Sequence, residues 1–579
     1  MYWLFKNYIK CTDKLKYYSA LIINIFGDII ARIWPVIFIG KIIDEGLIKN
    51  DYNAVIKYFL LSIILYATGI TLAYWGVAIT EKLVYRISNK IGETLYNKIN
   101  FMDNDYFKHT NSGEINTLFQ NDMKHMIRLL TYTLKQFSGE VLTAIFSIIY
   151  CIKINIPLTI IFLCFIPIYL ILIFTYNKKS KILYETERLK VSKLNQYLQE
   201  NIKGNKLIKN LGTEEKEIES FKEINTDYIN YKIKINYKMY NYMEFMKLLS
   251  QIIWIVLIAI GGFFIMKGQI TIGQFLIFNS LVNGIASPIY NLVDYTNDWR
   301  HFKVSVDKMK LLMNTNPKQK DKGSSILQNI NNIQFNNVNV EIDNKTILKN
   351  ININLEENKT YAFIGEVGSG KSTIGKLILR LIDNTTGEIL INNKNIQDYT
   401  ISSIRRKIGY VSQTPFLFSD TIKNNVNFGN LELTNEEIEY YLKLAKADYV
   451  KNLENGINTI IGENGVNLSG GEKQRLSLAR AIAIKPQILI LDDITSALDY
   501  ETELEVSNNI NNLDYKCMKI IIAQKIISIK NADKIFVIKS GEIIGEGTHE
   551  ELLNNCNMYK EIYEIQSGKN AIFKDIKEK

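Results

Sequence analysis

The sequence predicts a membrane protein with two parts: six transmembrane helices, followed by an α/β domain built around a phosphate-binding P-loop. Long charge-free apolar runs crowd the first half of the chain, as membrane-spanning helices require. In the second half, short β-branched runs alternate with helical stretches, which is typical of a largely parallel sheet. A glycine-rich loop ending in Lys-Ser lies between one of these runs and a helical stretch.

Six segments of the first half are predicted to span the membrane, because each reaches the roughly 20 residues that a bilayer crossing needs. They cover about 18–48, 58–80, 131–152, 154–177, 248–266 and 268–293. The first contains Asp28 and Arg32, which are expected to pair on one helix face, with substrate contact as the alternative. The third contains Glu140, which is expected to lie near an interface and stay solvated.

Positive charge predicts which side of the membrane faces the cytoplasm. Segment 82–130 holds seven Lys and Arg residues and segment 178–247 holds fifteen, whereas the short turns near Lys49, Lys153 and Lys267 carry about one each. The positive-inside rule therefore places both long loops and both termini in the cytoplasm. This topology accounts for the net charge of +10, so we expect no nucleic-acid partner. Helical spacing of apolar residues in these loops predicts helices that continue beyond the bilayer.

A change in composition marks the domain boundaries. The chain turns polar and Lys-rich between about 298 and 324, and β-branched runs begin soon afterwards. We therefore predict a transmembrane domain at 1–315, a linker at 316–329 and a nucleotide-binding domain at 330–579. The predicted strands of the last domain are 360–364, 389–391, 408–411, 487–491, 520–523 and 534–538.

The strongest motif is the P-loop pattern G-x-x-x-x-G-K-[ST], which follows a predicted strand and opens a predicted helix. Its glycines let backbone N–H groups wrap phosphates, Lys371 reaches the β- and γ-phosphates, and the Ser372 hydroxyl can bind Mg²⁺. The apolar run 488–491 ends at Asp492, the carboxylate expected to share that Mg²⁺. The predicted ATP-binding residues of this loop are Gly365, Glu366, Val367, Gly368, Ser369, Gly370, Lys371, Ser372 and Thr373.

Between the P-loop and Asp492 lies Leu468-Ser469-Gly470-Gly471-Glu472-Lys473-Gln474-Arg475, and with it the chain resembles the ATP-binding cassette (ABC) transporters. The resemblance covers nearly the whole chain. Gln413 looks like the Q-loop of the family, 461–465 like the exporter X-loop, and 496–499, which ends at Asp499, like the D-loop. Segments 113–122 and 208–215 look like the coupling-helix regions of exporters.

That resemblance implies a dimer of two cassettes with ATP at both interfaces. Each ATP lies between the P-loop of one chain and the signature of the other, so one chain is half of a transporter. Coupling helices then carry the motion of the cassettes to membrane helices that alternate between two openings. The implied partner-site residues are Leu468, Ser469, Gly470, Gly471, Glu472 and Asp499, and the implied Mg²⁺ ligands are Ser372, Gln413 and Asp492.

Three positions depart from the pattern of a hydrolytic cassette. Asp493 stands where the family carries the Glu that polarises the attacking water, so the carboxylate is drawn back by roughly 1.5 Å. Gln524 stands in place of the switch His and cannot relay a proton. Ile342 occupies the position of the aromatic residue that stacks on adenine. The resemblance thus assigns the catalytic positions to Asp493, Gln524 and Gln413.

Asp493 and Gln524 together resemble the degenerate-site subunit of heterodimeric bacterial multidrug-type ABC exporters. The implied function is ATP-driven export of a small or amphipathic, multidrug- or lipid-like molecule from a bacterial plasma membrane, alongside a second half-transporter. The alternatives are a homodimeric exporter, an importer with an exporter-like fold such as some siderophore systems, and an ATP-gated regulatory subunit. ATP and Mg²⁺ are the implied cofactors, and membrane lipid surrounds the helices.

The last predicted span offers a candidate substrate cavity. Phe275, Asn279, Asn283 and Tyr290 share roughly one helix face. Mixed aromatic and amide side chains would suit amphipathic or cationic molecules. Hydrogen bonding between helices explains the asparagines equally well.

Overall fold

The structure is a computed structural model that describes residues 3, 8, 11–317, 319, 321, 323–429, 432–494 and 499–567. It does not describe the side chains of Cys11, 176–181, Met243, Tyr290, Asn464 and Tyr500. The chain forms two compact units: Met1–Met102 with Thr110–Asn316, and Asp103–His109 with Pro317–Lys579. We call the first the membrane unit and the second the cassette unit.

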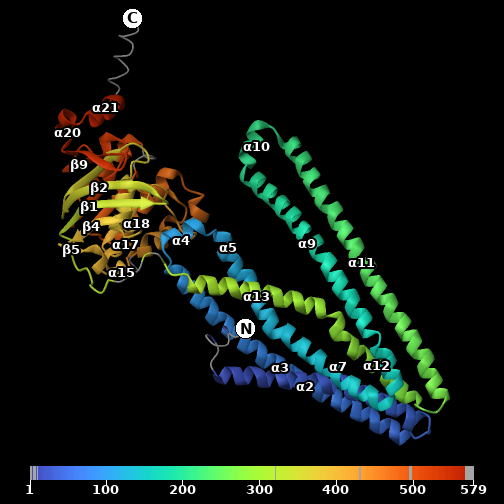
Figure 1. Cartoon of the computed structure of the whole chain (residues 1–579). Helices are drawn as coiled ribbons and strands as arrows, with labels where there is room; N and C mark the ends of the chain where they lie inside the picture. The colour runs from blue at the N-terminus through green and yellow to red at the C-terminus, as the bar shows by residue number, and fades with distance from the viewer. Residues whose placement is uncertain are drawn as a thin grey trace. The chain divides into compact units, whose positions relative to one another are not determined.

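The membrane unit is helical throughout (Figure 1). Its helices are α2 (Cys11–Lys41), η1 (Ile42–Leu47), α3 (Tyr52–Asn100), α5 (Ser112–Thr117), η2 (Leu118–Asp122), α6 (Met123–Arg128), η3 (Leu129–Thr133), α7 (Leu134–Ile154), α8 (Ile156–Leu163), α9 (Ile166–Lys203), α10 (Asn205–Leu211), α11 (Glu214–Met266), α12 (Ile272–Tyr290) and α13 (Leu292–Asn314). Some of these helices continue directly into the next, and others begin at a capping side chain; Asp51, for example, accepts hydrogen bonds from the first N–H groups of α3.

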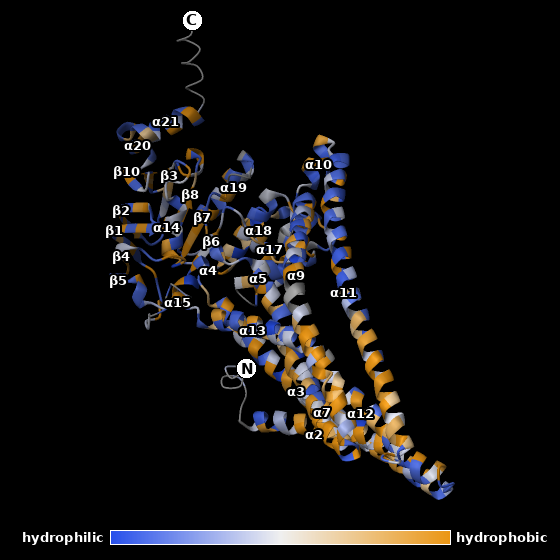
Figure 2. Ribbon diagram, turned by 45° about the vertical axis from the view of Figure 1, so that its right-hand side comes forward, coloured by the Kyte–Doolittle hydropathy of each residue, from blue (hydrophilic) through white to orange (hydrophobic). Residues whose placement is uncertain are grey.

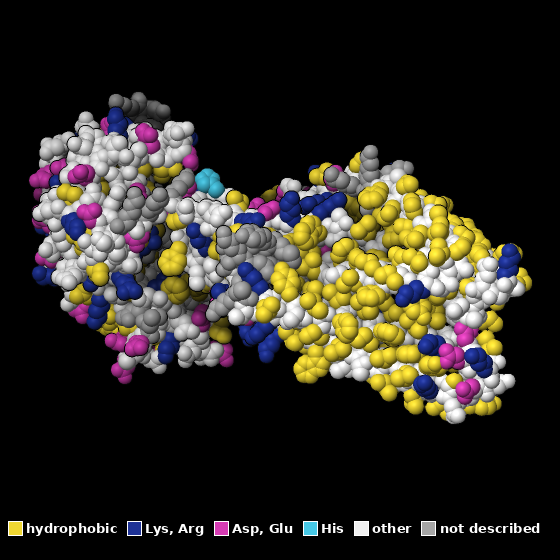
Figure 3. Space-filling model, turned by 60° about the horizontal axis from the view of Figure 1, so that its bottom comes forward, with side chains coloured by type: hydrophobic (Ala, Val, Ile, Leu, Met, Phe, Trp, Pro, Cys, Tyr) yellow, Lys and Arg dark blue, Asp and Glu magenta, His cyan; other side chains and the backbone are white. Residues whose placement is uncertain are grey.

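The six predicted spans are confirmed. Six helical stretches are long and apolar enough to cross a membrane: Thr12–Leu47, Tyr52–Asn100, Ser112–Ile154, Ile156–Thr175, Glu214–Met266 and Ile272–Asn314. Hydrophobic side chains crowd the surface of these helices, as a lipid-facing surface requires (Figure 3).

Helices α9 and α11 continue past the apolar length, as predicted. Figure 2 shows that each of the two helices is hydrophobic at one end and hydrophilic at the other end, near α10, which joins them. Ion pairs tie the two extensions together, Lys190 with Asp227 and Lys232 with Glu187. Neither helix contains an internal Pro after its first turn, so nothing in the backbone interrupts them.

Glycines bring α2 and α3 into backbone contact. A Cβ on Gly27 would lie 2.5 Å from the backbone N of Ala73, and one on Gly69 would lie 2.7 Å from the N of Ala31. Asn24 adds a hydrogen bond from its amide to the carbonyl of Ala73 at 2.7 Å. Small residues and interhelical hydrogen bonds of this kind hold helices together where lipid removes the hydrophobic drive.

Two predictions about charged residues in the spans are wrong. No ion pair joins Asp28 to Arg32, both of which the structure describes, because the Asp28 carboxylate turns to α7, 3.7 Å from where a Cβ of Gly139 would stand. Glu140 is not solvated; it is only 4% exposed. It is buried because amide groups of neighbouring residues satisfy its carboxylate in place of water.

The cassette unit contains two sheets. Six strands lie in the order β10-β9-β3-β8-β7-β6, parallel except for the β10/β9 pair, and four lie in the antiparallel order β2-β1-β4-β5. The strands are β1 (Asn332–Ile342), β2 (Lys345–Glu356), β3 (Thr360–Gly365), β4 (Thr386–Ile391), β5 (Lys394–Asn395), β6 (Ile408–Val411), β7 (Ile488–Asp492), β8 (Met518–Ile522), β9 (Lys534–Lys539) and β10 (Glu542–Gly547). The predicted α/β class is confirmed, although the predicted strand 389–391 belongs to the antiparallel sheet.

Helices precede, connect and follow these strands. They are α4 (Asn104–His109), α14 (Lys371–Ile378), α15 (Ile401–Arg405), α16 (Ile422–Val426), α17 (Asn435–Leu444), α18 (Gly470–Ala483), α19 (Tyr500–Asn511), α20 (His549–Asn555) and α21 (Asn557–Gln566), with short 3₁₀ turns between them. The core lies between the parallel sheet and its helices, where Phe363, Ile490 and Ile520 are fully buried.

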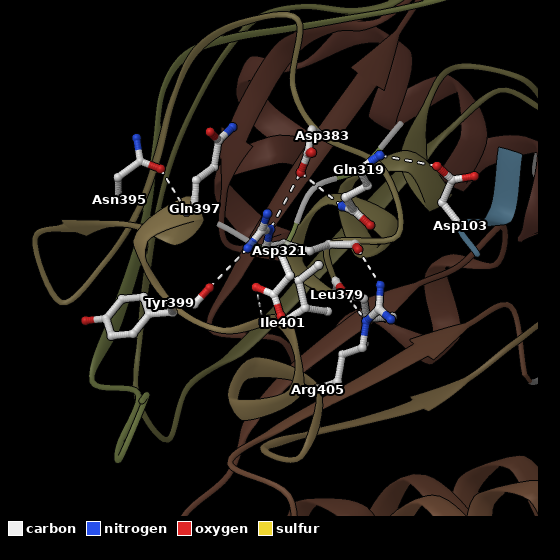
Figure 4. A network of polar contacts seen from close by, with 11 residues as sticks. Asp103, Gln319, Asp321, Leu379, Asp383, Asn395, Gln397, Tyr399, Ile401 and Arg405 are labelled. Atoms are coloured by element: carbon white, nitrogen blue, oxygen red, sulfur yellow. Dashed lines mark hydrogen bonds and ion pairs between the residues drawn. The ribbon is translucent and has the colours of Figure 1, made fainter. Parts of the chain in front are cut away.

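Part of the predicted linker lies on the cassette unit (Figure 4). The backbone N of Gln319 donates to Asp103 at 3.2 Å, and its side-chain amide donates to Asp383 at 3.0 Å. Asp383 lies 3.6 Å from the buried guanidinium of Arg380, which donates to the carbonyl of Tyr399 at 3.1 Å. Polar contacts therefore run from the segment after α3 to the end of the P-loop helix α14.

Candidate functional site

The P-loop surrounds the side chain of its own lysine, Lys371. Strand β3 ends at Gly365, and α14 begins at Lys371. The Lys371 ammonium donates to the carbonyls of Gly365 at 2.8 Å and Glu366 at 2.7 Å. Burial lowers the pKa of Lys371, and the nearby carboxylates of Asp493 and Asp492 oppose that shift. The buried Ser369 hydroxyl has no hydrogen-bond partner among the described residues, which suits a loop built to receive an anionic group.

Two glycines of the loop have left-handed backbone conformations but different surroundings. Gly370 has φ +101°, and a Cβ there would lie 2.6 Å from Leu348 Cδ2 and 2.9 Å from the carbonyl of Ile347. Gly368 has φ +83°, and a Cβ there would meet nothing within 4 Å. A residue with a side chain would therefore have a strained backbone at either position, but it would clash with its neighbours only at Gly370.

We expect Gly370→Ala to destabilise the P-loop by about 1–3 kcal/mol more than Gly368→Ala, because only the first adds a clash to the strain. Hydrogen–deuterium exchange of residues 360–378 in the full-length chain measures this local stability. Gly368→Ala is the matched control. Equal exchange rates in the two variants would contradict the expectation.

The hydroxyl groups of Ser372 and Tyr410 meet the Asp492 carboxylate beside the P-loop. The Ser372 hydroxyl donates to Asp492 Oδ1 at 2.8 Å, and the Tyr410 hydroxyl donates to Asp492 Oδ2 at 3.1 Å. Asp492 is 5% exposed and ends β7. Burial and this neighbouring carboxylate raise the pKa of Tyr410, so the phenol stays a donor. A hydroxyl and a carboxylate in contact form an oxygen donor set that fits Mg²⁺.

The three predicted catalytic side chains converge on one atom. Asp493 Oδ2 accepts hydrogen bonds from Gln413 Nε2 at 3.0 Å and from Gln524 Nε2 at 2.7 Å. Asp493 is 7% exposed and has φ +53°, a strained backbone conformation for a residue with a side chain. Burial raises the pKa of Asp493, whereas the two amide donors lower it. The short carboxylate is thus held at the site by two neutral amides.

The signature residues begin helix α18. Ser469 is the N-cap: its hydroxyl accepts from the backbone N of Glu472 at 3.3 Å, and Glu472 accepts from the backbone N of Ser469 at 2.7 Å. This capping box orients the helix N-terminus, with Gly470 and Gly471 in its first turn and Leu468 half-buried before it.

Asp499 and Ile342 lie at element ends. Asp499 begins α19 and accepts from the backbone N of Thr502 at 3.1 Å and from its hydroxyl at 3.0 Å; these bonds lower the pKa of Asp499. The remaining predicted D-loop residues, 496–498, lie outside the described residues. Ile342 ends β1 and packs against the core of the cassette unit.

Two family models match this chain. The ABC transporter transmembrane region matches residues 18–289, and the ABC transporter model matches residues 348–496. YfiB of Bacillus subtilis (strain 168), an "Uncharacterized ABC transporter ATP-binding protein", is 30% identical over 572 residues, covering 97% of this chain and 99% of that protein. The chain belongs to the ABC transporter family.

Other relatives support the same membership. A Staphylococcus aureus (strain NCTC 8325) protein, the "Putative multidrug export ATP-binding/permease protein SAOUHSC_02003", is 30% identical over 599 residues, covering 97% of this chain and 100% of that protein. A solved structure of a bacterial Atm1-family ABC exporter with ATP bound superposes with a TM-score of 0.79 at 22% identity, covering 96% of this chain and 99% of that chain. This ABC transporter chain therefore has the exporter fold, with one membrane unit and one cassette unit.

In the membrane unit of this ABC transporter chain, a cavity of about 290 Å³ lies between α2, α7 and α12. Of the four residues predicted to line a cavity, Asn283 lines this one, Phe275 and Asn279 do not, and the Tyr290 side chain lies outside the described residues. Positions 280, 284 and 287 form the cavity face of α12, and 275 and 279 lie about a quarter-turn or more from that face. The substrate role of the four residues stays a prediction.

Two groups of residues at these sites of the ABC transporter chain were not among those predicted from the sequence. Tyr410 was missed although it lies on β6, the strand beside β7; a polar residue near the carboxyl end of an adjacent parallel strand was the available signal. The cavity residues Thr143 and Ser147 carried no motif, and only the packing of α7 against α12 brings them to Asn283.

Proposed function

We propose that this chain is one half of a heterodimeric ABC exporter and that its own P-loop site binds ATP but hydrolyses it slowly. The main support for this proposal is that Asp493 stands in place of the family's Glu and accepts hydrogen bonds at Oδ2 from Gln413 and Gln524. A carboxylate misplaced by about 1 Å can lower a rate around a hundredfold. Gln524 can donate to a γ-phosphate but cannot take up or pass on a proton.

The other residues of the site keep a binding role in this proposal. The loop 365–373 wraps the phosphates, and Lys371 moves its ammonium from the loop carbonyls to the β- and γ-phosphates. Ser372, Asp492 and Gln413 would hold Mg²⁺, which neutralises phosphate charge when bound. Ile342 would face adenine without the stacking that an aromatic side chain provides.

The signature of this chain would complete the ATP site of a partner. Ser469 and the first turn of α18 would offer a helix N-terminus to a γ-phosphate, with Leu468, Gly470, Gly471 and Glu472 shaping it. Asp499 of the D-loop would contribute to the same partner site. An intact signature beside a weakened hydrolytic pair favours a working role over a passive regulatory one.

We further propose that the exporter works in the plasma membrane of a bacterium with both termini in the cytoplasm. The Lys and Arg residues gathered in the helical extensions support this orientation. The name of the Staphylococcus aureus relative favours multidrug-type export, and hence a small or amphipathic substrate. The domain bounds proposed from the composition of the chain are a transmembrane domain at 1–315, a linker at 316–329 and an ATP-binding domain at 330–579.

We expect the purified full-length chain, alone in proteoliposomes, to hydrolyse ATP slowly, and its complex with the partner half-transporter to turn over at least about tenfold faster. ATPase activity at matched protein concentration is the measurement, and ATP binding by both samples is the control for folding. Robust turnover by the chain alone would overturn the heterodimer proposal and favour the homodimeric exporter, in which this signature completes an identical site.

A further inference from the structure

The cavity between α2, α7 and α12 is polar although it lies within the membrane-spanning helices. Seven of its eleven lining residues are polar or charged, among them Arg32, Glu140 and Ser147. Polar and charged side chains within membrane spans are costly, so such a lining marks a candidate functional site.

Arg32 supplies a cation to this cavity. It lies in the span Thr12–Leu47, and no carboxylate of the described residues forms an ion pair with it. Asp28, four residues earlier, is directed to Gly139 on α7. The guanidinium therefore brings to the cavity a positive charge that no carboxylate of the described residues pairs with.

Glu140 lines the same cavity but forms no ion pair with Arg32, because its carboxylate is hydrogen-bonded to neighbouring amides. Its Oε1 accepts from Asn291 Nδ2 at 3.0 Å and from Gln136 Nε2 at 3.1 Å, and its Oε2 accepts from Asn291 at 3.2 Å. Three hydrogen bonds therefore hold this carboxylate within the protein.

Ser147 supplies a hydrogen-bond donor to the same cavity. It is fully buried, and its hydroxyl has no partner among the described residues. Gly284 lies opposite on α12, where a Cβ would come within 3.2 Å of the Ser147 hydroxyl. The lack of a side chain at Gly284 leaves room at the hydroxyl.

We propose that this cavity binds the anionic headgroup of an amphipathic molecule, with Arg32 as counter-ion and Ser147 as hydrogen-bond donor. A carboxylate, sulfonate or phosphate accepts from both groups, and guanidinium suits these anions because of its planar array of donors. Ile33, Val36 and Leu281 line the cavity too and would contact the apolar part. This substrate class rests on the proposed export function; it keeps the amphipathic character that the asparagines suggested and replaces the cationic alternative.

Binding of radiolabelled taurocholate, a sulfonate amphiphile, to the full-length chain in phosphatidylcholine nanodiscs without nucleotide tests the proposal. We expect Arg32→Gln to weaken binding about tenfold or more, because it removes a charge-assisted contact to the anionic headgroup. Arg32→Lys keeps the charge and should retain most of the affinity, and Ser147→Ala should have a smaller effect than Arg32→Gln. Lys49→Gln, at a turn outside the cavity, is the matched control and should bind as the wild type does.

A second arm separates a soluble anion from a lipid headgroup. Nanodiscs in which phosphatidylglycerol replaces phosphatidylcholine should lower taurocholate binding by the wild type if a lipid headgroup occupies the site, and leave it unchanged if the ligand is soluble. Equal taurocholate binding by wild type and Arg32→Gln in phosphatidylcholine would overturn the proposal, as would tighter binding of the cation tetraphenylphosphonium than of taurocholate. Binding of ATP by each variant shows that it is folded. Since no step requires hydrolysis, failure here leaves the proposed ATPase behaviour standing, and the converse also holds.

Discussion

ATP turnover at the P-loop site of this chain is expected to rise about a hundredfold when Asp493→Glu and Gln524→His are combined. Glu carries its carboxylate about one C–C bond, roughly 1.5 Å, further from the backbone. At present Asp493 Oδ2 is tied to two amides, Gln413 at 3.0 Å and Gln524 at 2.7 Å. Replacing Gln524 breaks one of these bonds and introduces a ring that exchanges a proton near neutral pH.

The measurement is ATPase activity of the assembled complex in which the P-loop lysine of the partner half-transporter is replaced, so that only this chain's site turns over. The single variants Asp493→Glu and Gln524→His are the matched controls, and each should have a smaller effect than the pair because the two side chains share one hydrogen bond. Unchanged turnover in the double variant would mean that hydrolysis is limited outside this pair.

Lys371→Ala is expected to weaken ATP binding by this chain about tenfold to a hundredfold, because it removes a charge-assisted contact to the phosphates. The ammonium already lies inside the loop, 2.8 Å from the Gly365 carbonyl and 2.7 Å from that of Glu366, so it needs little movement to reach a phosphate. Equilibrium binding of a fluorescent ATP analogue to the full-length chain, with Mg²⁺ present, measures the change.

Lys376→Ala is the matched control for this variant, since Lys376 lies in the last turn of the same helix α14 and outside the phosphate loop. It should bind the analogue as the wild type does. Affinity retained by Lys371→Ala would contradict the assignment of this loop as the ATP site.

The six spans were predictable because their signal is local. A predominantly apolar run of about 20 residues without charge is typical of a membrane-spanning helix. The surroundings of Glu140, Asp28 and Arg32 were not predictable in this way, because the contacts of a charged side chain within a span depend on residues of neighbouring helices. Asn291, which contacts Glu140, is 151 residues away in the chain.

The parallel sheet was predictable in class but not in order. β-branched runs between helices identify strands, yet nothing in a run such as 389–391 says that it pairs with β1 in an antiparallel sheet. Strands β1, β2, β5 and β10 were not predicted, because they lie outside the alternation of buried strands and helices that defines the parallel part.

The sequence by itself determined the membrane spans, the P-loop, the signature and the substitutions Asp493 and Gln524, because each of these is a property of residue types at short spacing. Only the tertiary structure decided which groups meet. Gln413 and Gln524 reach Asp493 from 80 and 31 residues away because strands β6, β7 and β8 lie side by side. Likewise, Arg32 shares a cavity with Ser147 only because α2, α7 and α12 pack together. Hydrogen bonds and charge contacts act over a few ångströms, so they depend on how the chain folds back on itself rather than on distance along it.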